Sequence, residues 1–467
     1  MAERIDRLTS AEKQLLQTAA VVGPEVPVRL LKAVADLPED DLDGHLRQLQ
    51  AGEFLYETRL LPEPVYAFKH ALTHEVAYAN LLQSQRRQLH IRIVEALERT
   101  GESDRQTDVA EVLAHHALNG ELWEKVCHYF TRAGTHATAR SAYREAVTSY
   151  EQALQGMAHL PNDQLWREQA VDLRLLLHAA LLRAGDPVRS MAILSEAQAI
   201  AEALDDAYRL GWIASYLSTH HFIAGDTEGA LAYGQRAQAL ADVCEDEALQ
   251  VDVRLHLGQA YHARGDYAAA MAVLAPNIDF VYQVLSRNPA ELPTIPGLHA
   301  LPWMILCLAE TGDFAQGERY IEEALGIAAI GERPYEQVVV YGSTGWLRCR
   351  RGDAAAATPW LERAMVCCQA AGIVQMLPIV ASFLGAAYLQ SGRRSEAIAL
   401  LEDAVERAMA MRVMVYHALS IVCLGQAYRL DGRLSDAKVQ AERAIDLSQT
   451  QKDSGNEAWA YHLLGET

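Results

Sequence analysis

The chain of 467 residues lacks the short motifs that most often mark a nucleotide-binding or hydrolytic enzyme. It contains no GxxxxGK(S/T) phosphate loop, no GxGxxG dinucleotide loop and no GxSxG nucleophile turn. His70 and His74 have the spacing of a zinc pair, but no glutamate of an HExxH motif lies between them. We therefore expect no catalytic residues, no metal site and no cofactor, and we interpret the chain as a non-enzyme.

The chain also has no paired cysteines and no long apolar run. Its seven cysteines include no CxxC pair, and most stand in apolar helical context, where cysteine behaves as a small hydrophobe. The first residues, MAERIDRLTS, do not resemble a signal peptide, and the most apolar stretch, 298–308, is too short to span a bilayer. These features predict a soluble protein of a reducing, cytoplasmic compartment.

Positive charge is scarce. Sixty-one acidic residues against 41 basic ones give a formal net charge of −20, and the acidic residues are spread along the chain. Such a surface repels nucleic acid and anionic lipid unless a local basic patch overrides it. We therefore expect neither nucleic acid nor a membrane as partner.

What the sequence does have is a repeat. Glycines recur with five spacings of 40 residues and one of 47, at Gly185, Gly225, Gly265, Gly312, Gly352, Gly392 and Gly432. Alanine recurs five and twelve residues after these glycines, glycine seven before them and tyrosine four before them, as in Gly258 and Tyr261 before Gly265. Turn glycines, small residues seven apart on one helix face and a tyrosine near the helix end are typical of stacked antiparallel helix pairs.

These columns resemble the tetratricopeptide repeat, over roughly 105–467, with helices longer than usual because the period exceeds 34 residues. The sequence predicts an all-α fold, a tetratricopeptide-like α-solenoid of about 40-residue helix pairs. The segment 139–154 fits as a degenerate repeat in which Ser141 replaces the turn glycine, and we expect a Pro-rich insertion between helices at 275–297. Because Gly465 repeats Gly425 after 40 residues, we also expect the array to continue past its last residue.

The first hundred residues have a different texture. Helical patterns at 10–22, 27–35 and 40–50 precede two short strands at 53–58 and 65–69, which is the order of a winged helix. Winged helices often bind DNA, but residues 1–100 hold 12 basic and 15 acidic side chains, a net of −3, and the third helix begins with three acids. We rank DNA binding as a lesser alternative and expect the cluster Arg86, Arg87, His90 and Arg92 to be a solvated helix face.

Two runs carry a closer resemblance. LLQTAAVVGPEVPVRLLKAVADLPEDDLDGHLRQLQAGEFLYE and YAFKHALTHEVAYANLLQSQRRQLHIRI are similar to the winged-helix portion of bacterial signal-transduction ATPases with numerous domains. In that family a P-loop domain comes first, then a winged helix, then long tetratricopeptide repeats, often with a class III nucleotide cyclase or a transcription-regulator domain fused to them. The resemblance implies a partner ATPase domain, upstream or in trans. It implies that His70, next to Ala71 where the family often has an acid, senses the nucleotide held there; a histidine that caps the hairpin-to-helix junction is the alternative.

The resemblance to peptide-binding tetratricopeptide domains places a groove three, six and thirteen residues before the turn glycines. Aromatic, Arg and Gln side chains on one curved surface suit capture of a peptide or protein segment. For Phe222, and for Trp212 in the same columns, packing in the core is an equally good interpretation. The predicted groove consists of Thr219, Phe222, Asp252, Gln259, His262, Trp346, Arg350, Gln426 and Arg429.

The sequence thus predicts four segments: a winged-helix domain (1–70), connecting helices (71–104), degenerate first repeats (105–160) and the repeat array (161–467). We expect a non-catalytic protein-interaction scaffold, the sensor or regulatory half of a signal-transduction ATPase, with a protein or peptide ligand in the groove. A free-standing tetratricopeptide adaptor is the alternative.

Overall fold

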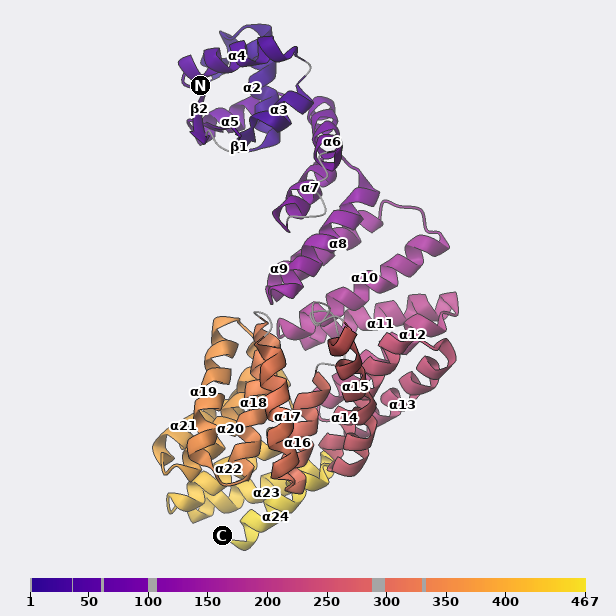
Figure 1. The fold of residues 1–467 in the computed structure, drawn as a ribbon, viewed down its shortest axis with the longest axis vertical. Coiled ribbons are helices and arrows are strands. Elements are labelled where there is room, and N and C mark those ends of the chain that lie inside the picture. Colours follow the sequence, from indigo (N-terminus) through magenta and orange to yellow (C-terminus); the bar gives the residue numbers. More distant parts are fainter. Residues whose placement is uncertain (1, 36, 60–62, 100–106, 288–298, 330–332) are drawn as a thin grey trace. The chain divides into compact units, whose positions relative to one another are not determined.

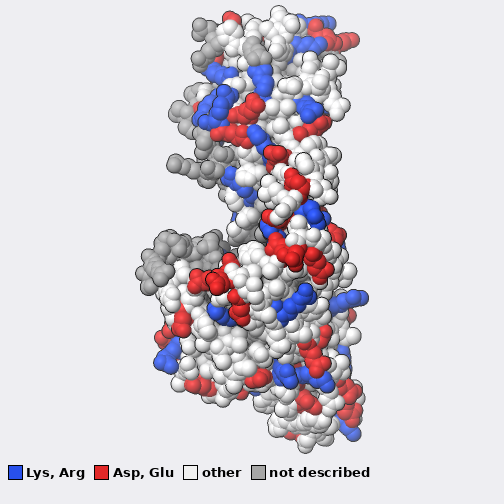
Figure 2. Space-filling view, turned by 90° about the vertical axis from the view of Figure 1, so that its right-hand side faces the viewer, with Lys and Arg blue, Asp and Glu red and all other residues white. Residues whose placement is uncertain are grey.

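The computed structural model describes residues 2–35, 37–59, 63–99, 107–287, 299–329 and 333–467. These residues form two compact units, one made of 1–136 and 148–166 and the other of 137–147 and 167–467. None of the described helices is both long enough and apolar enough to cross a membrane. Acidic and basic side chains are interspersed over the face shown in Figure 2, as the spread of charge along the sequence predicts.

The first unit begins with short helices and a small sheet (Figure 1). Strand β3 is central, pairs antiparallel with both neighbours and gives the order β1-β3-β2. The helices and both hairpin strands lie within a few residues of their predicted positions, whereas strand β1 was not predicted because it has only three residues. The elements are α1 (Ala2–Asp6), α2 (Ser10–Val22), β1 (Glu25–Pro27), α3 (Val28–Val34), α4 (Glu39–Ala51), β2 (Leu55–Arg59) and β3 (Val65–Phe68).

Longer helices follow, and a single apolar core joins the small sheet to the first of them. Leu15 and Leu16 on α2 and Leu31 on α3 are fully buried in this core, together with Ile93 of α6. The helices are α5 (Ala71–Ala79), α6 (Gln83–Arg99), α7 (Thr107–Asn119), α8 (Trp123–Ala139) and α9 (Tyr143–Met157).

The second unit contains the repeat array, in which consecutive helices pair antiparallel (Figure 1). Its helices are α10 (Gln164–Arg183), α11 (Pro187–Leu204), α12 (Ala207–Ile223), α13 (Thr227–Cys244), α14 (Glu247–Arg264), α15 (Tyr267–Arg287), α16 (Ala300–Thr311), α17 (Phe314–Ala328), α18 (Pro334–Arg350), α19 (Ala354–Ala370), the 3-10 turn η4 (Val374–Met376), α20 (Leu377–Gln390), α21 (Arg394–Met411), α22 (His417–Leu430), α23 (Leu434–Gln451) and α24 (Ser454–Gly465).

The glycine column marks the turn inside each helix pair, as predicted. All seven glycines have left-handed backbone conformations, with φ between 76° and 86°, and Ser141 takes the same conformation with φ 61° in the degenerate repeat. An aspartate directly after most of these glycines caps the next helix; the carboxylate of Asp353, for example, accepts a hydrogen bond from the Ala356 amide at 3.0 Å. The Gly-Asp pair therefore ends one helix and begins the next.

The small-residue columns are the contact surfaces between helices. The alanines five and twelve residues after the turn are buried; Ala230 and Ala237, for example, have no exposed surface. A Cβ atom on Gly258 would stand 2.6 Å from the Leu274 side chain, and one on Gly385 would stand 2.5 Å from that of Leu401. Glycine is required here because the leucine of the next helix occupies the space of a side chain.

The predicted insertion at 275–297 begins inside a helix. Helix α15 continues through Pro276 to Arg287, so 275–287 are helical rather than a loop. Residues 288–298 lie outside the described part of the chain. The Pro-rich composition suggested a break, but a proline costs a helix one hydrogen bond, and the buried side chains of Ile278 and Val281 hold the helix in its core.

Candidate functional site

Helices α12, α14, α16, α18 and α20 line one side of the array, which we call its inner face. Contacts between helices far apart in sequence close this face. The amides of Met414 and Val415, in the connection between α21 and α22, donate to the carbonyl of Ile223 at 2.7 and 3.1 Å. The hydroxyl of Ser454, at the start of α24, donates to the carbonyl of Arg264 at 2.6 Å. The end of the array therefore packs against the C-terminal ends of α12 and α14, about 190 residues earlier in the chain.

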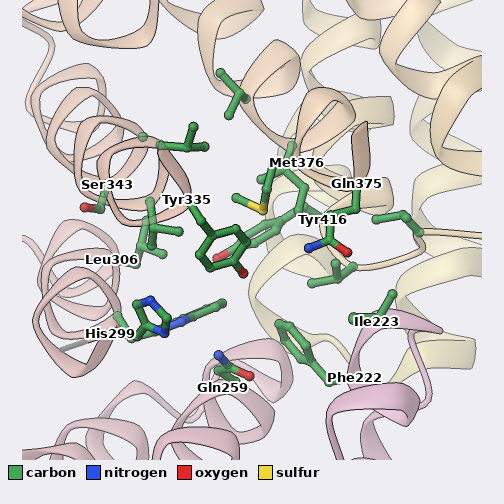
Figure 3. Close-up of a pocket in the computed structure, with 18 of the residues that line it drawn as sticks. Phe222, Ile223, Gln259, His299, Leu306, Tyr335, Ser343, Gln375, Met376 and Tyr416 are labelled. Carbon is green, nitrogen blue, oxygen red and sulfur yellow. The ribbon is translucent and has the colours of Figure 1, made fainter. Parts of the chain in front are cut away.

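This closure leaves a cavity of about 120 Å³ on the inner face (Figure 3). Helices α12, α14, α16, α18 and α20 line it, together with η4 and the connection 413–416. Most of the lining is apolar, and five aromatic rings take part: Phe222, Trp303, Tyr335, Phe383 and Tyr416.

Four of the rings form one connected set. Trp303 stacks on Tyr416 at 6.4 Å between ring centroids, and Phe383 meets Tyr416 edge to face at 5.4 Å. Phe222 adds a second edge-to-face contact to Trp303 at 5.6 Å. Rings packed in this way are rigid walls, because each one restricts the rotamers of the next.

The polar groups of the cavity are few and uncharged. Among the residues that line it there is no Asp, Glu, Lys or Arg. Burial lowers the pKa of His299, against the opposing effect of Glu336, and burial raises the pKa of Tyr416. Both side chains are therefore neutral at pH 7.

Three of these polar atoms are buried without a hydrogen-bond partner in the structure: His299 Nε2, Gln375 Oε1 and the Tyr416 hydroxyl. The nearest carboxylate oxygen to His299 Nε2 is on Glu336 at 3.9 Å, which is too long for a hydrogen bond. Figure 3 shows His299, Gln375 and Tyr416 around the same space, each from a different element. Unpaired buried polar atoms are costly, and a polar ligand atom bound in the cavity that these three residues line would give them a partner.

The structure brings part of the predicted groove to this cavity. Thr219, Phe222 and Gln259 line it. Trp346 is buried behind the wall and stacks on Phe383 at 4.5 Å. His262 contacts Trp303 at 5.3 Å from the other side of that ring.

The other predicted groove residues lie elsewhere in the same unit. Arg350 donates to Glu310 at 2.5 Å and lies 4.2 Å above the ring of Trp459. Arg429 forms an ion pair with Glu466 at 3.2 Å, and Gln426 is half-buried.

Asp252 belongs to an internal hydrogen-bonded group. Its carboxylate accepts from the Ser215 hydroxyl at 2.7 Å and lies 3.3 Å from His256 Nδ1. These two partners hold the pKa of Asp252 below its usual range despite the opposing effect of burial.

His70, the predicted nucleotide-sensing residue, is exposed at the N-cap of α5 in the first unit. Its backbone carbonyl accepts from the Thr73 amide at 2.9 Å, but its side chain makes no capping hydrogen bond. An exposed imidazole at a helix start is accessible to a group from another domain.

The expected solvated face at 86–92 is wrong for His90. This side chain is buried, its Nδ1 lies 2.8 Å from His116 Nδ1, and its Nε2 lies 3.2 Å from the Tyr78 hydroxyl. Burial lowers the pKa of His90 to about 4 and that of His116 to about 3, so both are neutral at pH 7. No sequence pattern marks this pair, because the two histidines come from different helices.

Sequence reasoning also missed the aromatic and polar residues that complete the cavity. His299 lies at the start of α16 and Trp303 lies within it. Tyr416 lies in the connection between two helices. The sequence carried no signal for Tyr416, because in the 40-residue register Val413, three residues before it, stands in place of Asp206, Asp246 and Asp453. Tyr335 and Gln375 stand in connections or helix starts where no column was defined.

Comparison with known proteins begins with sequence. No protein-family model matches the chain. An uncharacterized protein of Rhizobium meliloti (strain 1021) is 31% identical over 155 residues, a match that covers 33% of this chain and 15% of that protein. The chain thus matches well under two thirds of the length of this relative.

Solved structures resemble the chain in fold. A Rap protein complexed with Competence and Sporulation Factor is 13% identical, has a TM-score of 0.52, and is matched over 73% of this chain and 97% of its own. The Rap conjugation gene regulator of the plasmid pLS20, in complex with the Phr* peptide, is 12% identical with a TM-score of 0.53, over 71% and 91%. A signal-transduction ATPase with a tetratricopeptide repeat sensor from Pyrococcus horikoshii has a TM-score of 0.41 at 14% identity, over 98% of this chain and 60% of its own. The chain is an α-solenoid of stacked helix pairs, as its repeat predicted.

Proposed function

We propose that the second unit binds a peptide or protein segment on its inner face, and that the chain is the sensor or regulatory portion of a signal-transduction ATPase. The observation that carries the first part is the cavity, in which residues of the predicted groove meet unpartnered buried polar atoms. The two Rap structures of similar fold were solved with a bound factor or peptide. Binding sites are usually concave and mostly apolar, with a few polar groups that fix the orientation of the ligand.

Panning random 12-residue peptides against the purified chain tests the binding function. The decisive comparison uses Gln259→Met, which removes the amide from the inner face without removing volume, and Gln235→Met, an exposed position on α13. We expect enriched peptides to bind wild type and Gln235→Met equally and Gln259→Met about five- to tenfold more weakly, the loss typical of one buried hydrogen bond. Equal binding to all three proteins, or no enrichment, would refute it.

The ATPase connection rests on the resemblance of 15–57 and 66–93 to the winged-helix portion of that family. The order of elements fits it: a helix, a short strand, two helices and a hairpin in one antiparallel sheet. The coding DNA upstream should run in frame into a GxxxxGK(S/T) motif, or a neighbouring gene should encode that ATPase. An in-frame stop directly upstream, with no ATPase gene nearby, would contradict the proposal and favour a free-standing adaptor.

His70 can be tested once the ATPase is identified. We expect His70→Ala to change nucleotide retention by the complex, measured as release of bound ADP, while an exposed histidine on the second unit, His462→Ala, leaves retention unchanged. The exposed N-cap position of His70 makes the substitution tolerable for the fold.

A further inference from the structure

The size of the cavity limits what it can hold. An apolar cavity of about 150 Å³ is known to accept one benzene molecule. At about 120 Å³, the cavity between α12, α18 and α20 is comparable in size, and one six-membered ring fills it. Its walls are partly aromatic, with Trp303, Phe383 and Tyr416 among the residues that line it.

The absence of charged side chains from the cavity lining excludes a charged ligand. No acidic or basic side chain lines it, so a charged ligand would lose its hydration without gaining a counter-ion. The polar atoms that do line it require an occupant that can hydrogen-bond. The carbonyl oxygen of Gln375 can only accept, so it needs an O–H or N–H group, whereas the Tyr416 hydroxyl can donate or accept.

The backbone of Tyr416 supports a functional interpretation. This residue has a left-handed conformation, φ 61° and ψ 5°, which is unfavourable for a bulky side chain. The conformation places its ring between Trp303 and Phe383 and leaves its hydroxyl buried without a partner. Strain together with an unsatisfied polar atom is more typical of a binding site than of a site selected for stability alone.

We propose that this cavity binds one uncharged six-membered aromatic ring bearing a hydroxyl or N–H group, with Gln375, Tyr416 and His299 as its hydrogen-bond partners. The ring is supplied either by a tyrosine side chain of the peptide bound on the inner face, in which case this inference rests on the function proposed above, or by a free phenol. Both sources supply the same chemistry: an apolar ring that packs against the aromatic walls, and a polar substituent that hydrogen-bonds to the unpaired atoms.

The probe is p-cresol, titrated into the purified full chain by calorimetry and by ligand-observed NMR. We expect saturable binding at one site, at least about tenfold tighter than that of toluene, which has no hydrogen-bonding group. The anion p-toluate should not bind. Equal affinity for p-cresol and toluene, or binding of p-toluate in preference to both, would overturn the proposal, as would no binding of p-cresol.

Two variants locate the binding. Gln375→Met removes the acceptor while keeping the length of the side chain and should weaken p-cresol at least about fivefold without changing toluene. Val339→Phe fills the cavity and should abolish binding of both molecules, with circular dichroism to verify folding. Gln235→Met, exposed on α13, is the matched control and should bind like wild type. Unchanged affinity of p-cresol for Gln375→Met would refute the proposed site.

N-acetyltyrosinamide distinguishes the two sources of the ring. If it binds and competes with p-cresol, the cavity accepts a tyrosine joined to backbone; if only p-cresol binds, the ring site stands and its ligand is a free phenol. The two proposals fail separately. Peptides that bind with no response to Gln375→Met or Val339→Phe would show that no peptide tyrosine enters the cavity and would leave peptide binding intact. Binding of p-cresol without any enriched peptide would refute peptide binding and leave the ring site intact.

Discussion

At the scale of single residues, stability depends on where a side chain is absent as much as on where one is present. Gly258 lies in α14 against Leu274, which is fully buried, and Gly326 lies exposed in α17 with no atom within 4 Å of its Cβ position. Both are helical glycines, so they share the same intrinsic preference and differ only in packing. The pair therefore separates helix propensity from steric fit.

Gly258→Ala should destabilise the second unit by about 1–3 kcal/mol, because the new methyl group would overlap Leu274 and force it to move. Gly326→Ala should leave stability unchanged or raise it by up to about 1 kcal/mol, the helix preference of alanine over glycine. Urea denaturation followed by circular dichroism measures both. A stabilising Gly258→Ala would mean that the leucine has room to shift.

The turns between one repeat and the next also have a left-handed backbone conformation, but most of them lack glycine. They are left-handed at Asp205, Glu245, Gly372, Arg412 and Lys452, which stand in the same 40-residue register. Four of these five residues have side chains that disfavour this conformation. The sequence offered no glycine column here, so these turns could not be located from composition.

Glu245→Gly should therefore stabilise the protein by about 0.5–1 kcal/mol, since glycine has no penalty at φ 52°. The control Gln235→Gly, exposed within the same neighbourhood but helical, should destabilise it by roughly 0.5–1 kcal/mol. Thermal unfolding of the two variants measured in parallel gives opposite shifts of Tm if the assignment is correct. Destabilisation by both would show that the Glu245 side chain makes a contribution larger than its strain.

At the scale of elements, each second helix of a pair depends on its capping aspartate. Asp226 caps α13 through its Oδ1, which accepts from the Gly229 amide at 2.9 Å, and its Oδ2 lies 2.7 Å from His221 Nδ1. These hydrogen bonds, that of the Gly229 amide first, lower the pKa of Asp226 below 3.8. The carboxylate thus fixes both the start of α13 and the last turn of α12.

Asp226→Ala should destabilise the protein by about 1 kcal/mol at pH 7, the usual cost of losing an N-cap. Because the folded-state pKa lies below 3.8, the ionised carboxylate contributes fully above about pH 4, and this contribution is lost as the pH falls through the folded-state pKa. The stability difference between wild type and Asp226→Asn should therefore shrink as the pH falls below about 4. If the stability difference instead grows as the pH falls, the pKa of Asp226 is not lowered by folding.

At the scale of the whole second unit, the array is not simply a row of independent repeats. Most helices contact only their neighbours, as in any solenoid. Helix α24, however, packs Leu463 against Gly425 of α22 and also reaches Arg264 of α14 through Ser454. The last helix of the described array therefore contacts α14, about 190 residues earlier in the chain, and this contact closes the inner face.

Deleting 454–467 should raise amide hydrogen exchange at the C-terminal end of α14 as well as in α22 and α23, because the contact at Arg264 is lost together with the neighbouring ones. Deleting Thr467 alone is the control and should leave α14 unchanged. Exchange mass spectrometry resolves these segments. Loss of protection confined to α22 and α23 would show that the closing contact contributes nothing to α14.

What the sequence determined by itself is the repeating element. The 40-residue period, the turn glycines, the buried alanines and the helical fold all depend on contacts between neighbouring helices, and such contacts recur with the period that a single sequence displays. Gln259 and Thr219 were found on the inner face for the same reason, since their columns repeat with the turn.

Only the tertiary structure decided how the array closes and what its inner face encloses. The pairing of Ile223 with Met414 and Val415, the convergence of His299, Gln375 and Tyr416, and the buried His90–His116 pair all join residues with no periodic relation. In the array, such positions depend on small rotations between successive repeats, which accumulate along it and leave no mark in any one repeat. His90 and His116 meet through the packing of α6 against α7 in the first unit.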